Sequence, residues 1–168
     1  MKAVFMERHG GPEVLTFGDM PDPIAKPGEI LVDIVAASVN GADWKVRDGK
    51  SGQLARFPHI LGRDFSGVVS AVGEGVVDFR VGDEVFAVCD VGQEGAYAEK
   101  IAIKAAIAAP KTGRLSHVDA AALALAGLTA ICTIEDTLAL QPGETILIQG
   151  GAGGVASFAI QLAKHLGA

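Results

Sequence analysis

A glycine-rich segment near the end of the chain constrains the fold more than any other feature of the sequence. Residues 145–149 have an apolar centre at 146–148 and follow a Pro-Gly turn, and the next five residues contain four glycines. Residues 155–166 have the spacing of an amphipathic helix, which Gly167 would end. This order of strand, loop without side chains and helix is typical of a site that binds nucleotide phosphates.

The glycines match a known phosphate-binding pattern in the context that it requires. Gly151, Gly153 and Ala156 fit G-x-G-x-x-[G/A], and no Lys-Ser/Thr pair follows, which argues against a P-loop. A purely structural glycine turn is the alternative, but both flanks favour phosphate binding. The residues predicted to bind the cofactor are Gly150, Gly151, Ala152, Gly153, Gly154 and Val155.

The same motif predicts an unfinished domain. A complete unit needs about 30 residues of βαβ and a ribose-reading residue about 20 positions after the glycines. Counting from Gly151 passes Ala168, the last residue of the sequence. We therefore expect residues 143–168 to form an incomplete Rossmann nucleotide-binding domain, limited to its first β-α unit.

The first two thirds of the chain have a different character. Short β-branched segments recur between glycine and proline turns, which predicts a small β-barrel over residues 1–115. Glycines within the segment 60–73 indicate bulges or close backbone contacts. The fold class is therefore mainly β, followed by the start of an α/β domain.

Connecting helices are predicted for residues 116–142, between these two parts. Ser116 and Asp119 have the spacing of a capping box, and alanine and leucine dominate the next twenty residues. Gly127 is expected to interrupt or bend this helical stretch, and Pro142-Gly143 to end it.

Composition excludes several classes of function. The net charge of -6 and the lack of Lys/Arg runs argue against nucleic-acid binding. The two cysteines lie far apart, which predicts no disulfide framework and a cytoplasmic protein. Charges follow the first residues too early for a signal peptide, and no apolar run approaches the roughly 18 residues of a membrane span, so we expect no membrane association.

Few polar residues stand out as candidates for chemistry. Asn40, Asp43 and Thr129 lie in apolar surroundings, where turn and cap hydrogen bonds are the favoured interpretation. The simplest interpretation of Arg63-Asp64 is a local ion pair. The simplest interpretation of His117 is a solvated side chain at the first turn of a helix. The four histidines have no metal-ligand spacing.

Ordered blocks along the whole chain carry a family resemblance. The sequence resembles the medium-chain dehydrogenase/reductase superfamily, specifically its zinc-independent quinone oxidoreductase-like branch. The blocks are residues 28–32, 37–44, 61–69, 76–87, 95–99, 120–130, 150–156 and 159–164.

This resemblance implies a GroES-like catalytic barrel, a Rossmann domain, and a nicotinamide bound in the cleft between them. The implied reaction transfers hydride from NADPH to a quinone or an α,β-unsaturated carbonyl, with NADH left open. Asn40 and Lys45 match cleft positions of the family, and Thr129 matches the threonine near the nicotinamide. The implied partners are a small-molecule substrate and, for the parent enzyme, a second copy of the same chain.

The resemblance also implies that zinc is absent. Zinc-using relatives place a cysteine at position 40 and a His-Glu pair at 63–64, with a third ligand near Leu125 or Ala126. This sequence has Asn40 and Arg63-Asp64 there, and thiolate or imidazole is what zinc prefers. The four-cysteine lobe of those relatives is also missing.

Length leaves two hypotheses open. Family members are about two domains long, and this chain resembles their N-terminal half. The first hypothesis is an NADPH-dependent reductase of which these residues are a truncated part, inactive alone. The alternative is a non-catalytic GroES-like module or a fragment that binds a partner.

Overall fold

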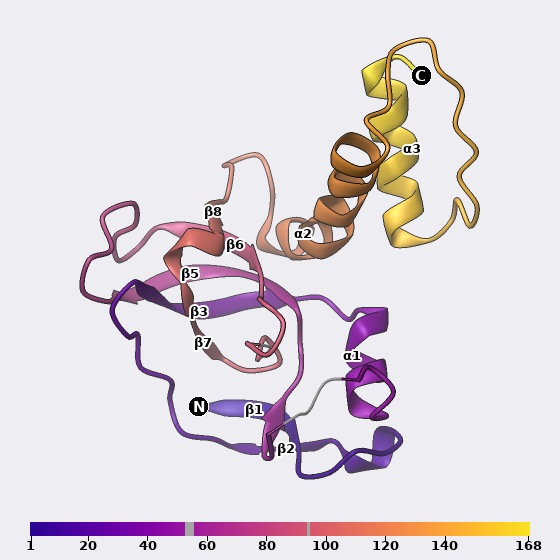
Figure 1. Ribbon diagram of the computed structural model, residues 1–168. Coiled ribbons are helices and arrows are strands. Elements are labelled where there is room, and N and C mark those ends of the chain that lie inside the picture. The colour runs from indigo at the N-terminus through magenta and orange to yellow at the C-terminus, as the bar shows by residue number, and fades with distance from the viewer. Residues whose placement is uncertain (53–55, 94) are drawn as a thin grey trace. The chain divides into compact units, whose positions relative to one another are not determined.

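The chain divides into two compact units, Met1–Ala122 and Leu123–Ala168. The computed structural model describes residues 1–52, 56–93 and 95–168. Figure 1 labels the helices and strands of both units. Each unit is described by itself below.

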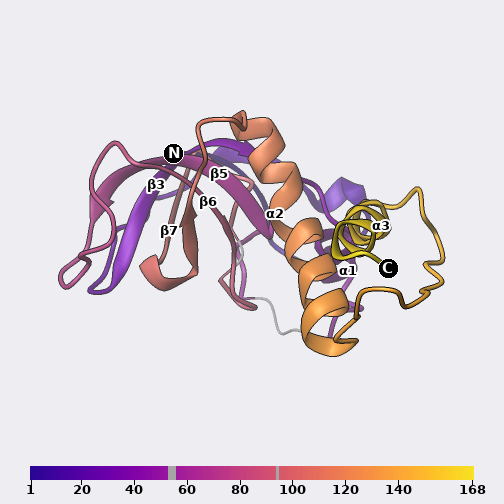
Figure 2. The same ribbon diagram turned by 90° about the horizontal axis from the view of Figure 1, so that it is seen from above.

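Two antiparallel sheets form the first unit, which confirms the mainly β prediction. Strands β3, β5, β6 and β7 of the larger sheet lie beside one another in Figures 1 and 2. The three-stranded sheet has the order β2-β1-β4, with β1 Lys2–Met6, β2 Thr16–Asp19 and β4 His59–Ile60. The five-stranded sheet has the order β7-β3-β5-β6-β8, with β3 Glu29–Ala37, β5 Asp64–Val72, β6 Glu84–Val88, β7 Lys100–Lys104 and β8 Ala108–Pro110.

One short segment connects the two sheets. The backbone N–H of Val4 in β1 donates to Tyr97, and that of Ile34 in β3 donates to Glu99, each at 2.8 Å. Ala98 also forms an isolated bridge with Ala3. Residues 97–99 therefore link β1 of the smaller sheet to β3 of the larger one.

The predicted irregularity of the 60–73 strand is confirmed. The pairing of β3 with β5 shifts register between Leu31 and Val32 and again between Ile34 and Ala36. Gly67 stands opposite Ile34, and a side chain there would overlap the carbonyl oxygen of Asp33. Glycine is therefore required because the two backbones approach each other closely.

An aliphatic core lies on the inner face of the five-stranded sheet. Alternate residues of β3 and β7 point into it, as expected for strands with one buried face. Phe65 is its largest fully buried side chain. The buried members of this core are Ile30, Val32, Phe65, Val69, Val85, Ala87, Cys89, Ala96, Ile101 and Ile103.

Short helical segments complete the first unit. Helix α1, Gly41–Arg47, follows Asn40, and Gly49 comes after it with a φ of 75°. Two 3-10 turns, η1 Pro12–Val14 and η2 Ala105–Ile107, lie in connections. Val46 of α1 packs with Met6, Val14 and Leu61, which fixes the helix against the smaller sheet.

Helix α2, His117–Ile131, runs through Gly127, so the predicted interruption there is wrong. The irregularity comes later, in the π-helical segment η3, Cys132–Thr137. Thr129, Thr133 and Thr137 each donate a side-chain hydrogen bond to a carbonyl four or five residues earlier. Such bonds compete with the regular backbone ladder and distort a helix.

The start of α2 partly follows the predicted capping box. The hydroxyl oxygen of Ser116 accepts from the backbone N–H of Asp119 at 3.1 Å. The Asp119 carboxylate accepts in return from the Ser116 hydroxyl, at 2.6 Å, and not from its backbone.

The continuous helix His117–Thr137 is 21 residues long and apolar enough to cross a membrane by length and composition. This corrects the expectation that no apolar run approaches that length. The indication is weak, because core helices of soluble proteins meet the same two criteria.

The second unit contains the predicted helix but not the predicted paired strand. Helix α3, Gly154–Leu166, ends at Gly167, whose φ is 89°. Residues 145–148 form no strand in the part of the chain that the structure describes. A strand is defined by hydrogen bonds to a neighbour, and no neighbouring strand is present among the residues described here.

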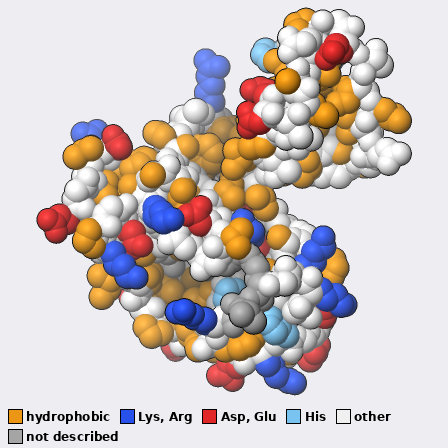
Figure 3. Space-filling model, in the orientation of Figure 1, with side chains coloured by type: hydrophobic (Ala, Val, Ile, Leu, Met, Phe, Trp, Pro, Cys, Tyr) orange, Lys and Arg blue, Asp and Glu red, His pale blue; other side chains and the backbone are white. Residues whose placement is uncertain are grey.

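A small cluster holds the second unit together. Ala130, Ile134 and Ala159 are buried at its centre, and Ile146 and Ile148 pack against them. Much apolar surface stays exposed, as Figure 3 shows by the orange side chains of this unit. Leu147 is 86% exposed, and a groove of about 530 Å³ between residues 144–148 and α3 is lined by Ile146, Ile148 and Ile160.

Candidate functional site

Asn40 lies at the start of α1, within a buried hydrogen-bond network. Its Nδ2 donates to the hydroxyl oxygen of Ser38 at 3.0 Å and to Oδ1 of Asp64 at 2.9 Å. The Ser38 hydroxyl donates to the same Asp64 oxygen at 2.6 Å. Asp64 is 0% exposed. Because Ser38 directly follows β3 and Asp64 begins β5, the Asp64 carboxylate connects the end of one strand with the start of the other.

Asp43, one turn into α1, is a second buried carboxylate of this region. Its Oδ2 accepts from the backbone N–H of Asn40 at 2.7 Å and from the Tyr97 hydroxyl at 2.8 Å. Its Oδ1 is buried and has no hydrogen-bond partner in the described part of the chain. Burial raises the pKa of the Asp43 carboxyl, the two hydrogen bonds oppose this, and the charge of Asp64 adds to it.

The raised pKa of Asp43 predicts an unusual dependence of stability on pH. As pH rises above about 3.9, the unfolded state loses this proton first, so folding stability falls until the higher folded pKa is passed. Asp43→Asn cannot ionise, and its amide oxygen can still accept both hydrogen bonds. We expect the variant to gain stability relative to the wild type as pH rises above about 3.9, until the folded pKa of Asp43 is passed, measured by urea unfolding.

Asp33 offers a matched control of opposite sign. The hydrogen bond from Lys100 lowers the pKa of the Asp33 carboxyl. Asp33 therefore contributes stability above its unfolded pKa, and that contribution is lost as pH falls through its folded pKa. Asp33→Asn should lose stability relative to the wild type as pH rises, and a parallel change in both variants would refute the assignment.

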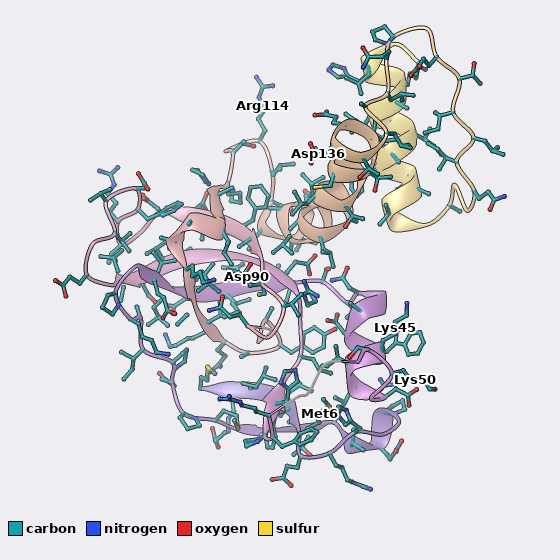
Figure 4. All side chains as sticks on the ribbon, viewed as in Figure 1. Met6, Lys45, Lys50, Asp90, Arg114 and Asp136 are labelled. Carbon is teal, nitrogen blue, oxygen red and sulfur yellow. The ribbon has the colours of Figure 1, made fainter. Side chains whose placement is uncertain are left out.

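Lys45 is exposed on α1. Its Nζ lies 5.8 Å from the centre of the Trp44 ring, within range of a cation–π contact. Lys45 and Lys50 both extend from this region in Figure 4, and Lys50 is paired with Asp48. Lys45 therefore has its ammonium group accessible to a ligand, next to an aromatic surface.

Thr129 lies in the second unit, on α2. Its hydroxyl donates to the carbonyl oxygen of Leu125 at 2.7 Å, and the side chain is exposed. This bond uses its only hydrogen, so towards a ligand Thr129 can act as an acceptor.

The glycine loop leads directly into α3. Gly150 has a φ of 70°, and Gly153 is the N-cap of α3. A Cβ on Gly153 would lie 3.2 Å from the carbonyl oxygen of Gly150, and one on Gly151 would lie 3.2 Å from Ile160. The loop therefore has little room for side chains at these two glycines, and it opens a helix of 13 residues.

Other polar side chains of the first unit also have defined hydrogen-bond or ion-pair partners. His117 contacts the Ser66 hydroxyl at 2.8 Å through Nδ1 and Glu84 at 3.2 Å through Nε2, so it is not simply solvated at the start of its helix. Lys111 pairs with the same Glu84 at 3.0 Å and lowers the pKa of that carboxyl. Arg63 donates to the carbonyl oxygen of Cys89 at 3.2 Å.

Comparison with known proteins assigns the family of the first unit. Residues 26–114 match the family described as "Alcohol dehydrogenase GroES-like domain". The chain belongs to this family. The GroES-like domain thus includes Asn40, Asp43, Asp64 and Tyr97, and places the chain in the medium-chain dehydrogenase/reductase superfamily.

Relatives of the whole chain are oxidoreductases. The chain is 34% identical over 173 residues to a quinone oxidoreductase of Sus scrofa, covering 99% of this chain and 50% of that protein. It is 38% identical to a 2-methylene-furan-3-one reductase of Solanum lycopersicum, covering 99% of this chain and 45% of that protein. The chain spans about half the length of the curated relatives it matches.

A solved structure shows the same arrangement of the chain. The quinone oxidoreductase of Escherichia coli, solved in complex with NADPH, matches 99% of this chain with a TM-score of 0.91 and 34% sequence identity. The chain covers 50% of that structure. The GroES-like barrel followed by the start of an α/β domain is therefore confirmed.

Proposed function

We propose that the protein carrying this sequence is an NADPH-dependent, zinc-independent oxidoreductase that transfers hydride to a quinone or an α,β-unsaturated carbonyl. The observation that carries the proposal is the match along 99% of the chain to quinone oxidoreductases, including one with bound NADPH. The domain organisation proposed is a GroES-like catalytic domain over 1–115, connecting helices over 116–142 and the beginning of a Rossmann domain over 143–168.

The residues present fit the proposed cofactor. Gly150–Val155 would hold the phosphates, because four of these six residues are glycines and the loop leads directly into α3. NADPH, when bound, supplies the hydride. Asn40 and Lys45 would orient the substrate or the nicotinamide, and Thr129 would accept a hydrogen bond near the nicotinamide.

The chemistry of the donor set supports a zinc-free enzyme. Asn40 and Asp64, at two of the positions that hold the metal in zinc-using relatives, are hydrogen-bonded to each other at 2.9 Å. Neither offers the thiolate or imidazole that zinc prefers. Among the residues that the structure describes, no group of three His, Cys, Asp or Glu side chains could hold a metal ion. We further propose a cytoplasmic homodimer that does not bind membranes or nucleic acid.

Oxidation of NADPH tests the reaction. The native polypeptide that carries this sequence is mixed with NADPH or NADH and either a quinone or an alkenal. We expect oxidation of NADPH that depends on the acceptor, unchanged by a chelator. No acceptor-dependent oxidation would overturn the proposed reaction, and stoichiometric zinc in the purified protein would overturn the zinc-free assignment.

Lys45 provides a specific prediction for this assay. Lys45→Met removes the ammonium group but keeps much of the chain that lies near Trp44, so we expect kcat/KM to fall about tenfold. Lys50→Met is the matched control, since Lys50 is exposed and pairs with Asp48. Equal effects of the two substitutions would contradict a role for Lys45 in the reaction.

A further inference from the structure

The hydrogen atoms around Asp64 determine how the Asn40 amide is oriented. The Asp64 carboxylate can only accept, and it accepts from Ser38 at 2.6 Å and from Asn40 at 2.9 Å. Ser38 has a single hydroxyl hydrogen, which it gives to Asp64. Its oxygen can therefore only accept from Asn40, at 3.0 Å.

These contacts use both N–H groups of the Asn40 side chain. The reverse orientation would place the amide oxygen against a carboxylate oxygen and against a hydroxyl oxygen whose hydrogen is already used. Each of those contacts would bring two acceptors together without a hydrogen between them. Because Asp64 is 0% exposed, water cannot relieve that repulsion. The carbonyl oxygen of Asn40, Oδ1, takes part in the capping box of α1, in which the Asn40 side chain accepts from the backbone N–H of Asp43. An amide oxygen can accept two hydrogen bonds, so the second acceptor site of Oδ1 is the group that Asn40 keeps for a ligand.

We propose that Asp64 is a positioning residue which, together with Ser38, fixes Asn40 so that Asn40 meets a ligand as a hydrogen-bond acceptor. Asn40 would then recognise an N–H or O–H group of the reduced cofactor, namely its carboxamide or a ribose hydroxyl. It would not stabilise the oxygen of a quinone or enone, because that oxygen needs a donor. This inference rests on the proposed function in placing Asn40 at the ligand.

The orientation itself can be tested on this chain without any activity. Asn40 is the only asparagine in the sequence, so selective ¹⁵N-asparagine labelling gives one side-chain NH₂ signal pair. We expect both of its hydrogens to exchange about tenfold more slowly than those of a free amide. Asp64→Leu has a similar shape but no acceptor, and it adds no second asparagine. It should shift both signals and remove that protection.

Two further variants keep this test decisive. Ser38→Ala keeps the Asp64 carboxylate and should remove the protection of one hydrogen only, which also covers a failure of Asp64→Leu to fold. Asp33→Ser changes a half-exposed carboxylate on β3, adds no asparagine and should leave the Asn40 signals unchanged. Exchange in the wild type as fast as in a free amide, or signals unmoved by Asp64→Leu or Ser38→Ala, would overturn the proposal.

Kinetics of the native polypeptide then test what Asn40 recognises. The 3-acetylpyridine analogue of NADPH lacks the carboxamide N–H groups but keeps the ribose hydroxyls. We expect Asp64→Leu to raise KM for NADPH about tenfold with a smaller change in kcat. If the Asp64 variant loses the wild-type preference for NADPH over the analogue, the carboxamide is the group that Asn40 recognises. If the variant keeps that preference but has a raised KM, the recognised group is a ribose hydroxyl.

The outcomes separate this inference from the proposed reaction. A wild-type protein that oxidises NADPH, with KM unaffected by Asp64→Leu, would overturn the positioning role alone. A wild-type protein without turnover would overturn the proposed reaction, and the NMR result would still decide how Asn40 is held.

Discussion

Gly67→Ala is expected to lower the free energy of unfolding by about 3 kcal/mol, at the upper end of the range for overpacked interiors. The added methyl group would overlap the carbonyl oxygen of Asp33 and lie 2.8 Å from a methyl group of Val32. Neither neighbour can move easily, since both belong to β3, which is paired on both sides by β5 and β7. Urea unfolding followed by circular dichroism measures the change.

Gly113→Ala is the matched control for Gly67→Ala. A Cβ on Gly113 has no atom within 4 Å, so we expect a change near zero or a slight gain from a less flexible unfolded chain. If Gly67→Ala were as stable as Gly113→Ala, then β3 and β5 would not approach as closely as described.

Phe65→Ala should have an effect of about 3–5 kcal/mol, the usual range for loss of a fully buried aromatic ring. Phe65 is 0% exposed and packs at the centre of the five-stranded sheet's core. It also follows Asp64 directly in β5, so the cavity would loosen the strand that holds the carboxylate of the candidate site. Thermal unfolding of the purified chain would measure the loss.

Phe17 is the control for the loss of a phenyl ring. It lies on β2 and is 71% exposed, so Phe17→Ala should change stability by about 0.5 kcal/mol or less. A comparable loss in both phenylalanine variants would show that the ring at position 65 is not the buried one.

Local signals in the sequence predicted local structure well. Gly167 ends α3 with a positive φ, and Ser116 caps α2. Each of these features depends on a few adjacent residues whose conformational preferences agree. The glycines of β5 likewise indicated a close approach of strands before the partner strand was known.

Features that depend on distant neighbours could not be predicted in the same way. Residues 145–148 have the composition of a buried strand, but without a neighbouring strand among the described residues they form no ladder. The distortion of α2 was expected at Gly127 and occurs at η3, where several threonine hydroxyls bond to backbone carbonyls. A glycine lowers helix propensity, but regular backbone bonds on both sides can still hold it in the helix.

In the candidate site too, features set by adjacent residues could be predicted, and features set by distant residues could not. Asn40 was singled out by its match to a family pattern, whereas its partner Asp64 lies 24 residues away and was interpreted as half of a local ion pair. Tyr97, which donates to Asp43, is separated from it by 54 residues. No spacing rule in a single sequence connects such residues, because the register of the sheets brings them together.

The position of Trp44 gives the molecule an optical reporter. It is the only tryptophan of the sequence, is 46% exposed, and stands on the same short helix as Asp43 and Lys45. Its fluorescence therefore comes from one place, four residues from Asn40. A reduced nicotinamide absorbs light in the range where tryptophan emits, so the emission of this residue would reveal, without any label, whether a cofactor comes near that helix.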